Sequence, residues 1–197
     1  GHGDCLVVRA PNGPTWLIDA GSRDAGRYRV VPFLRFAGIT AVDALVVTHP
    51  DEDHLGGAIA VLSTVRVRQL LTNGARDDRM VAREVWQHVR TQRIPATRVA
   101  AGMTWRANSG MRVDVLHPPE GFVPGTSPVS NDNSVVLKLT RGSVSLLLTG
   151  DLEEAGVPWL LRAGDALRST VLKVPHHGSR LGEAGAAFFH AVRPAVA

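Results

Sequence analysis

The sequence predicts a single α/β domain, and three observations support this fold class. The chain has 197 residues, a length that fits one domain with a substantial core, and 44% of them are apolar. Short apolar runs bounded by Gly, Pro, Asn or Asp recur along the chain, as is typical of buried strands. Amphipathic segments with helical spacing lie between several of these runs. No internal repeat or linker divides the chain.

The strands are predicted from the apolar runs and the helices from spacing. Strands are expected, in chain order, at residues 5–10, 15–20, 44–49, 68–72, 111–117, 134–140, 144–150 and 170–175. Helices are expected within residues 29–38, 56–64, 77–93, 153–164 and 183–192. In the segment 77–93, an Asp cap precedes a stripe formed by Val81, Val85 and Val89. Arg141-Gly142 is predicted to form the two-residue turn of a hairpin, and 117–133 is a Pro/Gly/Ser-rich loop.

The charge, the cysteine content and the length of the apolar runs each indicate which partners and which surroundings the chain could have. The formal net charge is +4, and lysine occurs only at Lys138 and Lys173, so the basic residues are almost all arginine, which suits phosphate through its planar fork. The single cysteine, Cys5, excludes a disulfide framework and is predicted to be a core thiol. No apolar run approaches the length needed to span a membrane. Both ends look cut, so we expect the chain to be a soluble piece of a larger protein.

Three predicted strands end in residues that bind metals. The strand at 44–49 runs into His49, Asp51, Asp53 and His54, within the stretch THPDEDHLGG. The strand at 144–150 ends at Asp151, and the strand at 170–175 ends at the pair His176 and His177. Loops at one edge of a sheet collect ligands, so these three ends are expected to converge.

Four histidines and three carboxylates match the ligand needs of two divalent cations. The positive ions would offset carboxylates that otherwise repel one another. Each cluster also has a plain structural interpretation: HPDEDH as a solvated turn with Asp53 capping the next helix, and paired histidines as buried or merely exposed side chains. The three clusters together, each following a buried-strand run, favour the metal site.

The combination of His-x-Asp-x-Asp-His, LLTGD and VLKVPHHGS resembles the metallo-β-lactamase superfamily. Within it, GHGDC, WLIDAG and SNDNSVVLKL are similar to segments of the C-terminal domain of ComEC-type DNA-uptake proteins. The resemblance covers nearly the whole chain. It implies an αββα sandwich with two divalent metal ions, manganese or zinc, at its edge.

The resemblance also implies roles for individual residues. His49 and Asp51 would bind one metal; Asp53, His54 and His176 would bind the other, and Asp151 would bridge them. His177 would be an outer-shell residue or proton donor, although His177 as the ligand stays open. The nucleophile would be a metal-activated water whose proton Asp53 orients or accepts.

Two departures from the superfamily pattern affect these assignments. Asp51 stands where most members have a second histidine, which favours oxygen-preferring ions such as manganese. The histidine that the superfamily supplies before the late hairpin is replaced here by Ser130, Asn131 and Asp132. The first metal is therefore expected to be weakly held or completed by water.

Further residues are candidates for supporting the site or binding substrate. Asp4 and Asp19 are expected to support the ligand loops rather than to bind metal directly, and His2 is a weak candidate near the site. For phosphate binding, turn formation is the equal alternative for Asn131 and Asn133. The candidate substrate-binding residues are Asn131, Asp132, Asn133, Ser134, Ser179 and Arg180.

Three functions remain open on this evidence. The first is a metal-dependent nuclease that degrades the non-imported DNA strand during natural transformation. The second is a small-molecule phosphodiesterase, phosphorylcholine esterase or lactonase on the same fold, and the third is a non-catalytic DNA-binding module. For the first, the resemblance implies DNA, the competence machinery and the membrane-channel portion of the same polypeptide as partners. The isolated domain is expected to be monomeric and to face the outside of a bacterial inner membrane.

Overall fold

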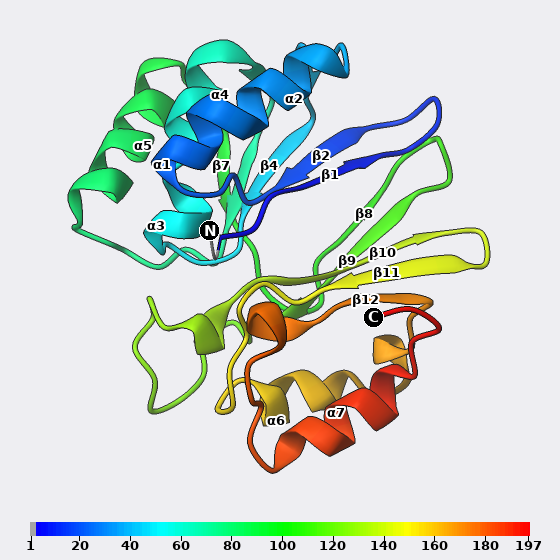
Figure 1. Cartoon of the computed structure of the whole chain (residues 1–197). Coiled ribbons are helices and arrows are strands. Elements are labelled where there is room, and N and C mark those ends of the chain that lie inside the picture. The colour runs from blue at the N-terminus through cyan, green and yellow to red at the C-terminus, as the bar shows by residue number, and fades with distance from the viewer. Residues whose placement is uncertain (1–2) are drawn as a thin grey trace. The chain divides into compact units, whose positions relative to one another are not determined.

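A computed structural model describes residues 3–197, and it resolves into two compact units, one up to Arg98 and one from Val99 onward (Figure 1). His2, a weak candidate from the sequence, lies outside the described residues. Among the described residues, no helix combines the length and the apolar character that a membrane crossing requires. Each unit contains a five-stranded sheet packed with helices.

The first unit is built on a mostly parallel sheet. Its strands lie in the order β1-β2-β4-β6-β7, with β1 antiparallel to β2 and all later neighbours parallel. The central strands are fully buried or nearly so, which explains their continuous apolar runs. The strands are β1 (Leu6–Arg9), β2 (Thr15–Ile18), β4 (Ala44–Val47), β6 (Leu70–Thr72) and β7 (Ala96–Arg98); a two-stranded ribbon pairs β3 (Ala41–Val42) with β5 (Arg66–Val67).

Helices cover the first sheet and complete its core. They are α1 (Arg23–Ala25), the π-helical η1 (Gly26–Val30), α2 (Val31–Phe36), α3 (Glu52–Leu55), α4 (Ala58–Thr64) and α5 (Met80–Thr91). Leu17 and Leu45 from the sheet pack in one cluster with Leu34, Val61 and Val85 from the helices. Burial of such side chains contributes about 1.5–3 kcal/mol each relative to exposure, so this layer fixes the position of the strand ends.

The second unit contains a mostly antiparallel sheet in the order β12-β11-β10-β9-β8, in which only β11 and β12 are parallel. Its strands are β8 (Thr104–Arg106), β9 (Arg112–His117), β10 (Val136–Arg141), β11 (Val144–Leu148) and β12 (Val171–Lys173). Its helical elements are η2 (Asn131–Asn133), α6 (Val157–Leu160), η3 (Leu161–Leu167), η4 (Pro175–Gly178) and α7 (Ala184–Val192). Val136, Leu147 and Phe188 lie in the core between this sheet and its helices.

The predicted α/β class is confirmed, with local corrections. The β10–β11 hairpin exists, but its two loop residues are Gly142 and Ser143 rather than Arg141 and Gly142. Gly142 has φ = 59°, and a glycine at the first loop position supplies the positive φ that tight hairpin turns need. Cys5 was expected in the core, but it lies just before β1 and is exposed.

The helix predicted at 77–93 corresponds to α5, and its details also differ. The helix begins after Arg79, and no side chain caps its start. Asp77 instead accepts a hydrogen bond from the backbone N–H of Arg79, at 2.9 Å. The buried stripe consists of Ala82, Val85 and Val89, whereas Val81 is half-buried at the margin of the core.

Candidate functional site

The loop after β4 is held by a buried carboxylate from the loop after β2. Asp19 is 1% exposed, and its Oδ1 accepts a hydrogen bond from the backbone N–H of Thr48 at 2.8 Å. Its Oδ2 accepts from Thr48 Oγ1 at 2.7 Å and lies 2.8 Å from Nδ1 of His54. Asp19 thus holds the start and the end of the THPDEDH motif, as expected of a supporting residue.

These bonds determine which nitrogen of each imidazole carries the proton. A carboxylate only accepts hydrogen bonds, so His54 must donate from Nδ1 to Asp19, which leaves Nε2 as a lone-pair donor to a metal. The single hydroxyl proton of Thr48 is already given to Asp19. His49 Nδ1, 3.0 Å from Thr48 Oγ1, must therefore donate to that oxygen, and its Nε2 is also left unprotonated. In its neutral form, each of these two buried histidines therefore has the tautomer that binds a cation through Nε2.

Two glycines after the motif let its backbone approach the loop after β2. A Cβ on Gly57 would lie 1.9 Å from the carbonyl oxygen of Ala20, a distance that real side chains do not reach. The backbone N–H of Gly57 donates to Gly21 O at 2.8 Å, and Ala20 N–H donates to His54 O at 2.9 Å. Gly57 therefore allows a close contact that positions His54.

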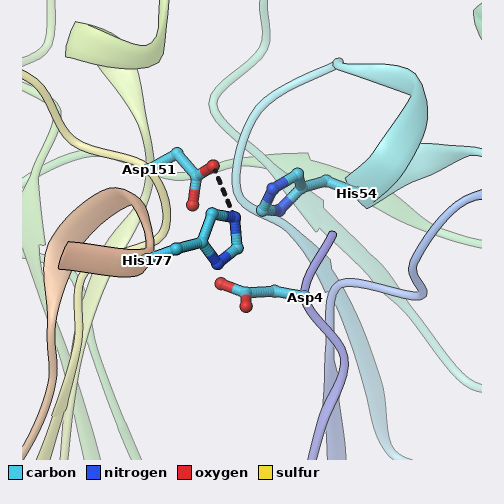
Figure 2. A group of neighbouring side chains, drawn as sticks. All are labelled: Asp4, His54, Asp151 and His177. Carbon is cyan, nitrogen blue, oxygen red and sulfur yellow. Dashed lines mark ion pairs between the residues drawn. The ribbon is translucent and has the colours of Figure 1, made fainter. Parts of the chain in front are cut away.

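Asp4 and His54 form a first pair of candidate ligands, here called the N-terminal pair. Their ligand atoms lie within 4.8 Å of each other, and Asp4 is half-buried while His54 is fully buried (Figure 2). Gly3, in the sequence GHGD, lies directly against the backbone of Asp53, where a Cβ would be 1.8 Å from the carbonyl oxygen. This close contact brings the start of the chain to the motif. Asp4 is therefore itself a candidate ligand, whereas only a supporting role was expected for it from the sequence.

The other acidic residues of the motif differ in their surroundings. Asp51 Oδ2 lies 3.7 Å from Nε2 of His49, while its Oδ1 accepts a hydrogen bond from Arg79 at 2.9 Å. Arg79 also contacts Asp77. Burial alone would lower the pKa of the Arg79 guanidinium, but the hydrogen bonds and charges of Asp51 and Asp77 together outweigh it and raise this pKa above its usual value. Asp51, not Asp53, occupies the N-cap position of α3, and Asp53 is half-buried.

In the second unit, Asp151 and His177 form a corresponding C-terminal pair. Asp151 follows β11 and is 3% exposed, and its Oδ2 lies 3.3 Å from Nε2 of the more exposed His177 (Figure 2). Lys173 contacts the same carboxylate through Oδ1 at 3.3 Å and donates to the carbonyl of Gly150 at 2.8 Å. Nε2 and Oδ2 at this separation can bind a single ion, because each bond to zinc is about 2.1 Å long.

The two neighbouring histidines are held in unusual backbone conformations. His176 has φ = 44° and His177 has φ = 54°, and both are in the left-handed region that few residues other than glycine adopt. This turn directs the two rings differently. His176 Nδ1 lies 3.0 Å from Glu153 and its Nε2 is 3.8 Å from Asp151, so His176 is shared between two carboxylates.

The residues suggested for substrate binding lie in two groups. Ser179 and Arg180 are exposed after η4. Asn133 is fully buried. Its Oδ1 accepts a hydrogen bond from Val123 N–H, and its Nδ2 donates to Thr126 Oγ1 and Ser127 O, so it stabilises the loop, which agrees with the turn-forming alternative. Asp132 accepts from Gly156 N at 3.0 Å, Asn131 donates to Glu153 at 3.1 Å, and Ser134 is fully buried.

The comparisons with known proteins agree with this fold. The model of the metallo-beta-lactamase superfamily matches residues 1–187, and the chain belongs to this superfamily of metallo-hydrolases, whose fold it has. Divalent metal ions are typical of the fold, and the described residues include candidate His and Asp ligands.

Among curated relatives, the chain is 30% identical over 213 residues to ComE operon protein 3 of Bacillus subtilis and 32% identical over 198 residues to competence protein ComA of Neisseria gonorrhoeae. Both matches cover 100% of this chain but only 27% and 25% of those proteins. The chain thus spans about a quarter of their length. The predicted resemblance to ComEC-type competence proteins is confirmed.

Among solved structures, a diphosphatase from the PhnP family shares the fold with a TM-score of 0.51 at 17% identity. The match covers 98% of this chain and 70% of the diphosphatase.

Proposed function

We propose that the chain is a metal-dependent nuclease domain that cleaves DNA, and that the N-terminal and C-terminal pairs bind its metal together. The observation that carries this proposal is the match to competence proteins over the full length of a chain with two His–carboxylate pairs. The superfamily match spans both pairs. As one domain of a longer membrane protein, it would degrade the strand that is not imported during natural transformation.

The chemistry of the side chains fits divalent ions. His54 and His49 hold their Nδ1 protons towards acceptors and present Nε2, and Asp151 and Asp4 supply hard oxygen ligands. We assign His177 rather than His176 to the metal, because His177 lies closer to Asp151 while His176 is shared with Glu153. This reverses the preference drawn from the sequence. His49, Asp51 and Asp53 are proposed as the remaining ligands.

Bound divalent ions would polarise a phosphodiester and lower the pKa of a coordinated water. The protein residues hold this site in place. Asp19 orients His54, and the buried Thr48 passes that constraint to His49. Lys173 compensates the charge of Asp151. Asp53 is proposed to accept a proton from the attacking water, and His176 to donate one to the leaving oxygen.

Cleavage of DNA by the purified chain tests the proposal. Wild-type protein loaded with Mn²⁺ is expected to cleave linear DNA, and Asp151→Asn is expected to reduce the rate by at least a hundredfold without lowering the thermal stability measured in EDTA. Asp165→Asn, which changes an exposed carboxylate of the same unit, is the matched control and should cleave normally. Metal content is measured for each protein.

Two results would contradict the proposal. Metal-loaded protein that hydrolyses a small phosphoester or lactone but leaves DNA intact would favour the small-molecule enzyme. Protein that binds DNA in EDTA and never cleaves it would instead be a binding module.

A further inference from the structure

A groove on the first unit is lined by arginines and lies outside the candidate ligands. It has a volume of about 590 Å³, and its lining residues belong to α5, the edge strand β7, and the end of β6 with the loop after it. Figure 1 labels α5 and β7 in the first unit. Arg76, Arg83, Arg90 and Arg98 line it, all of them exposed. Trp86, which is half-buried, also lines it.

The spacing along α5 places three of these side chains on one wall. Arg83, Trp86 and Arg90 are separated by three and four residues, so they share a face of the helix. Arg83 and Arg90 are about 10.5 Å apart along the axis, at 1.5 Å per residue. This separation is too large for both to hold one phosphate group. It suits two separate phosphates of one extended strand, with the indole of Trp86 between the two arginines.

The opposite wall carries Arg98 at the end of β7. A Cβ on Gly74 would lie 2.5 Å from Cγ and Cδ of Arg98, so the Arg98 stem lies across the bare backbone of this glycine. Gly74 also has φ = 78°, which makes a larger residue unfavourable there. The glycine leaves the space in which the Arg98 stem runs along the groove.

The two acidic residues of the groove do not neutralise it. Asp77 is engaged by Arg79, which is not a lining residue, at 2.7 Å. Asp78 is 3.9 Å from Arg83, and its side chain is 98% exposed, so this long, water-exposed pair is weak and a phosphate can displace it. The lining residues therefore carry a net positive charge.

The groove is connected to the THPDEDH loop within the same unit. Arg79 contacts Asp77 of the groove and also donates to Asp51 Oδ1 at 2.9 Å and to Pro50 O at 3.1 Å. Arg79 would thus lie between a strand held in the groove and the THPDEDH motif.

We propose that this groove binds the sugar–phosphate backbone of single-stranded DNA, with Trp86 stacking on a base. Arginines along a track with an interleaved aromatic ring are the arrangement that binds single strands without sequence preference. The choice of DNA as the partner rests on the proposed function, whereas the groove itself does not depend on metal.

The test measures binding of fluorescein-labelled dT20 by fluorescence anisotropy in EDTA, where cleavage is absent. Arg83→Glu/Arg90→Glu is expected to weaken binding at least tenfold and to reduce the slope of log K against log [salt] by about 1.4. The matched control is Arg29→Glu/Arg35→Glu, which makes the same charge change at two exposed arginines that do not line the groove. It is expected to bind within twofold of wild type.

Trp86→Leu provides a second test, with thermal unfolding to verify that it folds. Its affinity for dT20 should fall about fivefold or more, while its salt slope stays at the wild-type value. Equal weakening by both arginine pairs would mean a non-specific charge effect and would overturn the proposal. Unchanged binding in Arg83→Glu/Arg90→Glu would also overturn it and leave the groove to an acidic protein segment.

Failure of this proposal can be distinguished from failure of the nuclease proposal. Metal-loaded wild-type protein that never cleaves DNA, while Arg83→Glu/Arg90→Glu weakens dT20 binding as expected, would overturn the nuclease proposal and keep the groove. If the wild-type protein cleaves DNA but Arg83→Glu/Arg90→Glu binds dT20 as the wild type does, the groove proposal is excluded and the nuclease proposal is kept.

Discussion

Replacing Asp19 by asparagine removes one acceptor from a site at which every partner is a donor. The three partners are Thr48 N–H, Thr48 Oγ1–H and His54 Nδ1–H. An asparagine side chain has one acceptor oxygen and an NH₂ group, so in either orientation its NH₂ faces at least one of these donors. Asparagine tolerates the φ of 56° at this position, so the backbone is not an additional source of strain.

The expected magnitude follows from the bonds that are lost. A hydrogen bond to a charged group contributes about 1.5–3 kcal/mol, so Asp19→Asn should lower the free energy of unfolding by about that amount in urea denaturation. His54 also loses the partner that fixes its tautomer, and such losses reduce metal affinity by about 10–100-fold. Isothermal titration with Mn²⁺ measures the second effect, and Asp24→Asn, at an exposed position in α1, is the control. A Kd for Mn²⁺ equal to that of wild type, in a variant that is folded, would refute the assigned role of Asp19.

Three further predictions concern stability. Burial, opposed by a hydrogen bond from the ring to Ser134 O and by the charge of Asp132, lowers the pKa of His117 from 6.5 to about 4. Between these two pH values the unfolded chain binds more protons than the folded protein, so the free energy of unfolding should fall by about 3 kcal/mol as the pH drops from 6.5 to 4. Urea titrations should show a shallower loss of stability in His117→Gln than in the wild type, and parallel curves would contradict this. Gly57→Ala should destabilise the protein by about 1–3 kcal/mol, because the new Cβ meets Ala20 O, whereas Gly121→Ala, with nothing near its Cβ position, should cost less; equal effects in thermal unfolding would be inconsistent with the close contact. Mn²⁺ at a hundred times its Kd should stabilise the wild type by about 2.7 kcal/mol and Asp151→Asn by much less. If the melting temperature of the wild type is the same with Mn²⁺ and with EDTA, that result would argue against a metal site.

The parts of the fold that sequence reasoning predicted are those set by local burial. Continuous apolar runs such as that of β4 are buried on both faces, and they were predicted as strands. β7 was missed because its residues Ala96–Arg98 are all exposed, which leaves no apolar pattern to detect. β3 and β5 contain two residues each, too few for any periodicity.

The site was predicted to the level of residue types and strand ends, and no further. Asp151 follows β11 closely, whereas His54 lies in α3, after the loop that follows β4. The difference between His176 and His177 depends on two successive left-handed residues, and the contact of Asp51 with Arg79 joins positions 28 residues apart. Both features arise from tertiary structure, so a pattern along the chain contains no signal for them.

The central claim is that the N-terminal and C-terminal pairs hold the same metal. Anomalous diffraction at the zinc edge from crystals of the metal-loaded protein tests it most directly. The account predicts an anomalous peak about 2.1 Å from Nε2 of both His54 and His177, with Asp151 as a third ligand. A bound ion that is coordinated by residues of only one pair, or that lies away from both, would contradict it.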